Sequence, residues 1–295
     1  MATESWVVAG PQIIEVENVA SLRVQLVGGR VDVVAHDGPG ARIEVHSVEG
    51  RPLEIGLADG ELRLGYSFTL SGWDGFLEKF RNFRDKDRAD VHIAIPRAVA
   101  AKVGTVSADG LLAGVAEDSS VSTVSGSLVT DGTRGRLGVN TVNGEVVVRD
   151  HGGPLKLNTV SGEIAASGDL SLVQANSVSG ALSLDVTTGT SSVTASTVSG
   201  DVTVRLPAGR GVHVKAQSVS GRLVVDGEEY KGSSPGGRKV DMSTGDGACF
   251  VSASTVSGHV TVLRGAPGQP QDQMQDQVSD QVSDQVQDDV QGGVA

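Results

Sequence analysis

The residues best suited to chemistry in this chain are two glutamates, Glu145 and Glu163, each directly after the glycine of a repeated T-V-[SN]-G motif. Their spacing of 18 residues would place them one turn apart in a stacked structure. Paired carboxylates of that kind can bind a cation or work as an acid–base pair. However, Ser127, Ala181 and Arg222 occupy the same position in other copies, so no continuous row of acids results. Solvated corner residues are the commoner outcome for such glutamates.

The other groups that could do chemistry lack the spacing of a site. No H-x-x-x-H or comparable ligand pattern joins the histidines, which are His36, His46, His92, His151, His213 and His259. There is no G-x-S-x-G elbow with a base and an acid, and no glycine turn is followed by G-K-[ST]. Cys249 can form no internal disulfide and is expected to be a buried small hydrophobe. The sequence therefore predicts no catalytic residue, no metal site, no cofactor and no enzyme activity.

The repeated motif predicts the architecture. Its central valines are Val124, Val142, Val160, Val178, Val198, Val219 and Val256. The first steps between them are 18 residues, and later steps are 20, 21 and 37. Within a unit, apolar residues alternate as in a strand, and the glycine marks a bend. A fixed period of this length indicates an all-β repeat protein, a parallel β-solenoid with coils stacked ~4.8 Å apart. A flat meander of antiparallel hairpins is the alternative.

Two side-chain columns follow from the repeat. Asn140, Asn158 and Asn176 share a face with the central valines and are expected to form an asparagine ladder. We expect the valines to point inward, because burying a branched apolar side chain is worth ~1.5–3 kcal/mol. The flanking Thr and Ser positions would then form an exposed hydroxyl stripe. Such a stripe could bind an ordered surface such as ice or a glycan through Thr141, Thr159 and Thr197.

Composition divides the chain into three parts. Residues 1–100 are predicted to form an N-terminal β-region or cap, interrupted by an aromatic insertion at 66–90. Residues 101–265 hold the repeats, with a turn-rich insertion near 228–239 that should project as a hairpin. The acidic Gln/Asp-rich residues 266–295 are predicted to be a disordered tail.

The aromatic insertion is the candidate partner-binding segment. Its apolar residues have helical spacing and alternate with Lys and Arg, which predicts a short basic amphipathic helix. These residues are Trp73, Phe76, Leu77, Phe80 and Phe83. They either cover one end of the β-core or dock on a partner or an anionic membrane surface.

Net charge and hydropathy restrict the partners and the location that we expect for the protein. The formal net charge is −12, so the basic footprint needed for nucleic-acid binding is missing. No stretch reaches the ~20 apolar residues of a transmembrane helix, and the N-terminus has no signal-peptide pattern. These features lead us to expect a cytoplasmic protein.

The strand V-H-I-A-I-P at 91–96, the small-residue segment after it and the T-V-S-G repeats resemble a bacterial β-strand-repeat family. This "putative adhesin" family, also called the toastrack domain, is similar over roughly residues 13–265. The resemblance implies a solenoid-like fold and an association with envelope-stress and membrane-linked regulation, but it carries over no functional residues.

The predicted function is a non-enzymatic scaffold or adhesin-like interaction module. We expect a protein partner that is associated with a membrane. Self-association is a further possibility that the sequence allows. A carbohydrate-active β-helix enzyme and a surface- or glycan-binding Thr/Ser array are the alternatives.

Overall fold

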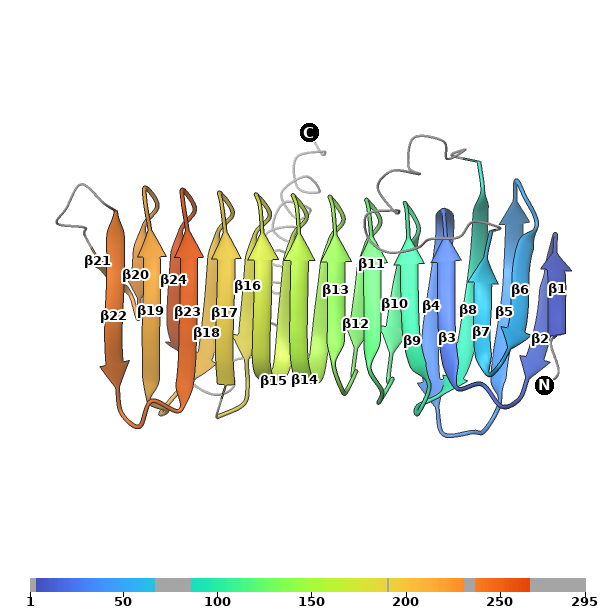
Figure 1. Cartoon of the computed structure of the whole chain (residues 1–295), viewed down its shortest axis with the longest axis horizontal. Coiled ribbons are helices and arrows are strands. Elements are labelled where there is room, and N and C mark those ends of the chain that lie inside the picture. The colour runs from blue at the N-terminus through green and yellow to red at the C-terminus, as the bar shows by residue number, and fades with distance from the viewer. Residues whose placement is uncertain (1–3, 67–85, 190, 231–236, 266–295) are drawn as a thin grey trace, which may run out of the picture. The chain divides into compact units, whose positions relative to one another are not determined.

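The computed structural model describes residues 4–66, 86–189, 191–230 and 237–265. These residues form strands and turns that stack into a solenoid (Figure 1). The described segments contain no helix, and hence none long and apolar enough to cross a membrane. The prediction of an all-β solenoid is confirmed. The chain up to Arg264 forms one compact unit. The acidic tail lies outside the described residues.

The strands form two faces that enclose the core. Face 1 contains, in stack order, β1 (Glu4–Val8), β6 (Leu53–Ala58), β7 (Glu61–Gly65), β3 (Ser21–Leu26), β9 (Ala100–Thr105), β11 (Ser119–Thr123), β13 (Leu137–Thr141), the ends of β14 (Val146–Thr159) and β15 (Ile164–Ser177), β17 (Ser191–Thr197), β23 (Cys249–Thr255), β19 (Val212–Ser218) and β22 (Arg238–Thr244). Face 2 contains β2 (Gln12–Val16), β5 (Ala41–Glu49), β8 (Arg88–Pro96), β4 (Gly28–His36), β10 (Asp109–Ala113), β12 (Leu128–Asp131), the starts of β14 and β15, β16 (Leu182–Val186), β18 (Val202–Pro207), β24 (Val260–Gly265), β20 (Leu223–Val225) and β21 (Glu228–Tyr230).

Equivalent residues of successive coils lie directly above one another. Leu137 pairs with Leu155, Leu155 with Val173, and Val173 with Val193, all in parallel register. Each of these side chains is at most 2% exposed. The parallel ladder excludes the antiparallel meander for the repeats. It builds a core of aliphatic columns from coils that could not bury an apolar face alone.

The predicted inward orientation of the motif valines is wrong. In β13 the buried residues are Leu137, Val139 and Thr141, so Asn140 and Val142 face outward. Successive side chains of a strand point to opposite faces, so only one of these two sets of residues can be buried. Leu137 and Val139 together bury more apolar area than Val142 alone, and they carry the threonine of the motif inward with them.

The motif glycines form a column in which the backbones of neighbouring coils touch. A Cβ on Gly162 would lie 2.2 Å from the carbonyl oxygen of Gly144. One on Gly180 would lie 1.9 Å from the carbonyl oxygen of Gly162. Real Cβ atoms do not approach so closely, so these positions accept only glycine. The expectation of a bend that excludes a side chain holds here.

The first coil in sequence is not the first coil in the stack. β3 pairs in parallel with both β7 and β9, and β4 pairs with both β8 and β10. The coil of β3 and β4 therefore lies between two coils that follow it in sequence. Antiparallel strands β1, β2, β5 and β6 close this end of both faces.

The C-terminal end also departs from sequence order. The last coil, β23 and β24, lies between the coil of β17 and β18 and the coil of β19 and β20 (Figure 1). β21 and β22 pair antiparallel with β20 and β19 and form the outermost strands. The predicted projecting hairpin near 228–239 is therefore wrong in part. Its two sides extend the faces of the solenoid.

Replacing Gly162 by Ala should destabilise the protein by roughly 1–3 kcal/mol or more, because the new Cβ overlaps a carbonyl of the neighbouring coil. Denaturant unfolding followed by circular dichroism measures the loss. Gly138→Ala is the matched control, since a Cβ there lies 3.6 Å from Ser120, an ordinary contact. Equal unfolding midpoints for the two variants would contradict the steric argument.

Candidate interaction surface

Each T-V-[SN]-G turn is closed from inside by its first residue. The Thr141 hydroxyl donates to the Gly144 carbonyl at 2.9 Å, and the Thr159 hydroxyl donates to that of Gly162 at the same distance. Both threonines are buried. In a later copy, Gly200 N–H donates to the Thr197 hydroxyl at 2.9 Å. This short-range side chain–backbone bond satisfies a buried hydroxyl and holds the turn.

Because the first residue of the motif points inward, the central valine that follows it points outward. Val160, Val178 and Val198 are 41%, 49% and 50% exposed, and Val256 and Val219 are 49% and 61% exposed. Val106, Val124 and Val142 continue the row with partial burial. We call these eight residues the valine line. With ~4.8 Å per coil, seven steps give a line of about 34 Å along the edge where face 1 turns into face 2.

Neutral polar residues flank the valine line. On one side, exposed Ser161, Ser179 and Ser199 follow the valines. On the other side, Asn158 donates from Nδ2 to Asn140 Oδ1 at 2.9 Å, and Asn176 donates to Asn158 at 3.2 Å. Asn140 donates in turn to the Ser122 hydroxyl at 3.3 Å. Each amide thus donates one bond to the preceding coil, and the row lies on the surface.

The exposed threonine stripe that the sequence suggested is absent at the predicted positions. Thr141, Thr159 and Thr197 are at most 7% exposed, because their hydroxyls face the turn glycines. A ligand could reach the serines and valines of the edge. It could not reach these threonines.

The predicted partner-binding residues Trp73, Phe76, Leu77, Phe80 and Phe83 lie outside the described residues. The described ends of their segment lie on the same edge as the valine line. The Asp87 carbonyl accepts a hydrogen bond from Gly28 N–H at 3.1 Å, and the Val27 carbonyl accepts one from Ser107 N–H at 2.7 Å. These bonds join the connection between β7 and β8 to the first T-V-S-A turn, two coils further along the stack.

An ion pair between the half-exposed Arg51 and the buried Asp87 holds this connection. Arg51 binds Asp87 through Nη2 and Nε at 2.7 and 2.9 Å, and its backbone N–H donates to the same carboxylate. Asp87 is only 3% exposed. The guanidinium also lies 5.4 Å from the ring centroid of Tyr66, a cation–π contact. Burial raises the pKa of Tyr66 to about 12, so the phenol is neutral at physiological pH.

The two glutamates singled out for chemistry are exposed and lie one coil apart. Their backbones are linked, since the Glu163 carbonyl accepts from Val146 N–H, the residue after Glu145, at 2.9 Å. Ser127 precedes them in the column and Ala181 follows, so two acids stand between uncharged neighbours. Within the described ranges, no three His, Cys, Asp or Glu side chains gather as metal ligands would.

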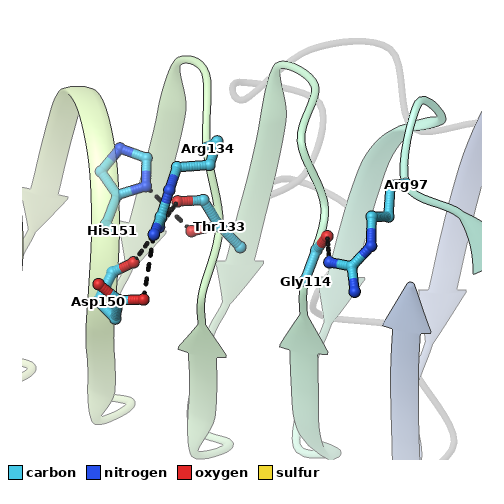
Figure 2. A network of polar contacts seen from close by, with 6 residues as sticks. All are labelled: Arg97, Gly114, Thr133, Arg134, Asp150 and His151. Atoms are coloured by element: carbon cyan, nitrogen blue, oxygen red, sulfur yellow. Dashed lines mark hydrogen bonds and ion pairs between the residues drawn. The ribbon is translucent and has the colours of Figure 1, made fainter. Parts of the chain in front are cut away.

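One histidine has a hydroxyl partner, at the opposite edge of the solenoid. His151 Nδ1 lies 3.0 Å from the Thr133 hydroxyl (Figure 2). Its Nε2 lies 3.4 Å from the Pro154 carbonyl. A carbonyl only accepts, so Nε2 carries the proton and Nδ1 accepts from threonine. Arg134 covers the pair and binds the Asp150 carboxylate at 3.1 Å. Both His151 and Thr133 are fully buried, so no substrate reaches this nucleophile-like pair, and its role is structural.

A cavity of about 1140 Å³ opens at the N-terminal end of the solenoid. Its wall contains Glu4, Glu15, Glu17 and Asp59, while Arg42 is bound to Glu15 at 3.4 Å. The acidic wall disfavours anionic ligands. The spacing of these acids in the sequence gave no sign of the cavity, because they come from strands that meet only in the fold.

Thr141→Val should cost about 1–3 kcal/mol of stability, because the valine keeps the shape but leaves the buried Gly144 carbonyl without its donor. Thermal and denaturant unfolding measure the difference. The control is Thr194→Val on the same face, where the threonine is exposed. A Thr141 variant as stable as the control would show that the hydroxyl does not hold the turn.

The buried His151 should make stability fall in acid. Burial lowers its pKa below the ordinary value of 6.5, so the unfolded chain binds the proton more tightly than the folded one. The stability from the neutral ring is complete above pH ~6.5 and is lost as pH falls through the folded-state pKa. Unfolding midpoints at pH ~7.5 and ~5.5, on either side of the ordinary histidine pKa, should differ less in His151→Gln than in the exposed control His46→Gln. Equal pH dependence in the two variants would refute this.

Comparison with known proteins identifies the family. No curated protein matches the chain. A "putative adhesin" from Parabacteroides distasonis is 13% identical and covers 86% of this chain and 98% of its own, with a TM-score of 0.47. A "putative lipid binding protein" from the same species is 9% identical over 87% and 96% of the chains, with a TM-score of 0.45. A "putative cell adhesion protein" from Clostridium sporogenes is 13% identical over 86% and 100%, with a TM-score of 0.27.

At these identities and TM-scores the three structures assign nothing to this chain. The family model described as Toastrack DUF4097, in contrast, matches residues 43–263, which is most of the described solenoid. The match includes the strand at 91–96 and the T-V-[SN]-G turns on which the resemblance was based. The chain belongs to the Toastrack DUF4097 family.

Proposed function

We propose that the protein is a rigid, non-enzymatic interaction module that binds a membrane-associated protein partner through the edge bearing the valine line. The observation that carries the proposal is the row of exposed valines, since the repeat places a branched apolar side chain on the surface in coil after coil. Exposed apolar side chains that form a continuous row mark interaction sites far more often than scattered ones do.

The polar flanks suit a protein partner. Serine and asparagine side chains beside the valines give the edge an apolar centre and an uncharged polar rim, as in many protein interfaces. The stacked coils keep the row in one geometry, so binding would order few side chains and lose little conformational entropy.

The position of the ends of the aromatic segment also favours this edge as the contact surface. Its five candidate residues belong to a connection that starts and ends on this edge, held at its base by Arg51 and Asp87. Its Lys and Arg residues would favour a partner near an anionic membrane surface. A cytoplasmic location, the absence of nucleic acid among the partners and the link to envelope stress stay predictions from the sequence.

The descriptions of the similar structures as adhesion or binding proteins agree with a module of this kind. The carbohydrate-active alternative is disfavoured because Glu145 and Glu163 stand exposed between uncharged residues, with no row of acids around them. A glycan-binding array is also disfavoured, because the threonines that would form it are buried and only its serines remain exposed.

The test is a triple variant of the edge, Val160→Ser, Val178→Ser and Val198→Ser. Losing three contacts of about 1 kcal/mol each would weaken binding roughly a hundredfold. Intact and variant proteins are used to recover partners from soluble and membrane fractions of the native cells, and the binding is then titrated. The control replaces the exposed Ile13 in β2 and Leu172 in β15, which lie away from the edge, by Ser.

Loss of the partner with the edge variant but not with the control is the expected result. A further variant with Ser at Trp73, Phe76, Phe80 and Phe83 should also lose the partner while keeping its β-type circular dichroism. Equal recovery by the edge variant and the control would refute the valine line as the contact surface.

A further inference from the structure

The strands from β19 to β24 are attached to the rest of the solenoid through their last coil. β23 pairs with β17 on one side and with β19 on the other, and β24 lies between β18 and β20. In the described chain, the pairings of β19 and β20 are all with strands that follow them in sequence. These strands therefore form a block, which we call the C-terminal block. It can assemble first and then dock on the edge of β17 and β18.

The connection into the C-terminal block is short for the distance it must cover. Residues 208–211 lead from β18 on face 2 to β19 on face 1, two coils further along the stack. Two coil steps of ~4.8 Å and a separation of ~10 Å between the faces require about 14 Å. The five residue steps from Pro207 to Val212 span at most about 17 Å. Ordinary coils climb one step with a connection of the same length, such as 187–190. Residues 97–99 make the same two-coil step from β8 to β9 with one residue fewer, so residues 208–211 have about one residue to spare.

This connection also has hinge-like features. Gly209 has φ +75°, a conformation that favours glycine. Gly211 N–H donates to Asp246 Oδ1 at 3.0 Å, and the Gly211 carbonyl accepts from Cys249 N–H at 3.1 Å. These contacts close the connection against the turn that precedes β23. Opening them would free the connection to change direction. The block itself is released when β23 and β24 part from β17 and β18, and no strand inside it breaks.

The docking edge makes contacts that any copy of the chain could supply. Ser191 to Ser196 pair in parallel with Cys249 to Ser254, mainly through backbone hydrogen bonds. The inward side chains are aliphatic, with Val193 beside Val251 and Ala195 beside Ala253. At the turn, His259 N–H donates to Asp201 Oδ1 at 2.7 Å. A second copy presents the same strands in the same register, so exchange would restore each of these contacts.

We propose that the edge of β17 and β18 accepts the C-terminal block of a second copy of this chain, giving a dimer in which the two copies exchange their blocks. In the exchanged form residues 208–211 run from one copy to the other. The inference rests on the order of strands and the reach of the hinge, and it is independent of the proposed function of the valine edge.

Deleting Gly209 and Arg210 tests it. The three remaining steps reach about 10 Å, which is too short for the ~14 Å of the closed form. We expect most of the full-length variant to have twice the monomer mass by light scattering after size exclusion. Its β-type circular dichroism should be unchanged. Cys249, which is buried in β23, should stay unreactive toward Ellman's reagent. Inserting Gly-Ser-Gly at the same place is the matched control and should give a monomer.

Every other outcome counts against the exchange. A monomer with unreactive Cys249 would mean that the block docks in its own chain despite the deletion. A monomer with reactive Cys249 would mean that the block is released and finds no second copy. A dimer that separates within minutes of dilution would be a surface association, since exchanged blocks must undock to separate.

If the deletion variant fails to fold, the variant Gly209→Pro tests the exchange instead. No heavy atom lies within 4 Å of a Cβ at this position, so the Cβ of a new residue meets no neighbour. Proline fixes φ near about −65° and should favour the extended hinge. A dimer fraction several-fold above that of the unaltered protein at equal concentration supports the proposal, and an unchanged fraction overturns it.

Discussion

The close approach of backbones at the T-V-[SN]-G turns is the constraint on which the solenoid depends. Each glycine carbonyl occupies the place that a Cβ of the next coil would need. The coils can therefore keep their parallel ladder through the turn without splaying apart. The buried Thr or Ser of each motif binds the glycine of its own turn, so the polar groups brought inside by the bend are satisfied locally.

The exposed valine line is a consequence of that turn. A residue between an inward threonine and an outward serine lies at the apex of the bend, where no neighbouring strand can cover it. The motif therefore stabilises the coil with its first and last residues and leaves its second residue available at the surface. One short sequence serves both purposes, and repetition converts an ordinary exposed valine into an extended apolar row.

Both ends of the stack depart from sequence order, and both thereby protect the parallel ladder. At the N-terminal end the coil of β3 and β4 is covered by later strands, and antiparallel β1, β2, β5 and β6 form the outer edge. At the other end the last coil is enclosed and the antiparallel β21 and β22 lie outermost. An open parallel edge invites further strands, so short antiparallel strands at the ends limit aggregation. The difference is that only the C-terminal arrangement requires a later coil to enter between two earlier ones.

The sequence by itself determined the local features of the protein. The 18-residue period, the β-type alternation and the glycine after each motif predict stacked parallel coils with bends that exclude side chains, because these depend on short-range sterics. The absence of ligand or nucleophile spacing predicts no catalytic site. Tertiary structure decided which face of each strand is buried, since alternation is symmetrical and the apolar content of the whole coil selects the inward set. It also decided the order of the end coils and placed the described ends of the segment at 66–90 on the edge of the valine line. Those choices depend on pairing between segments far apart in the chain, and no local pattern encodes them.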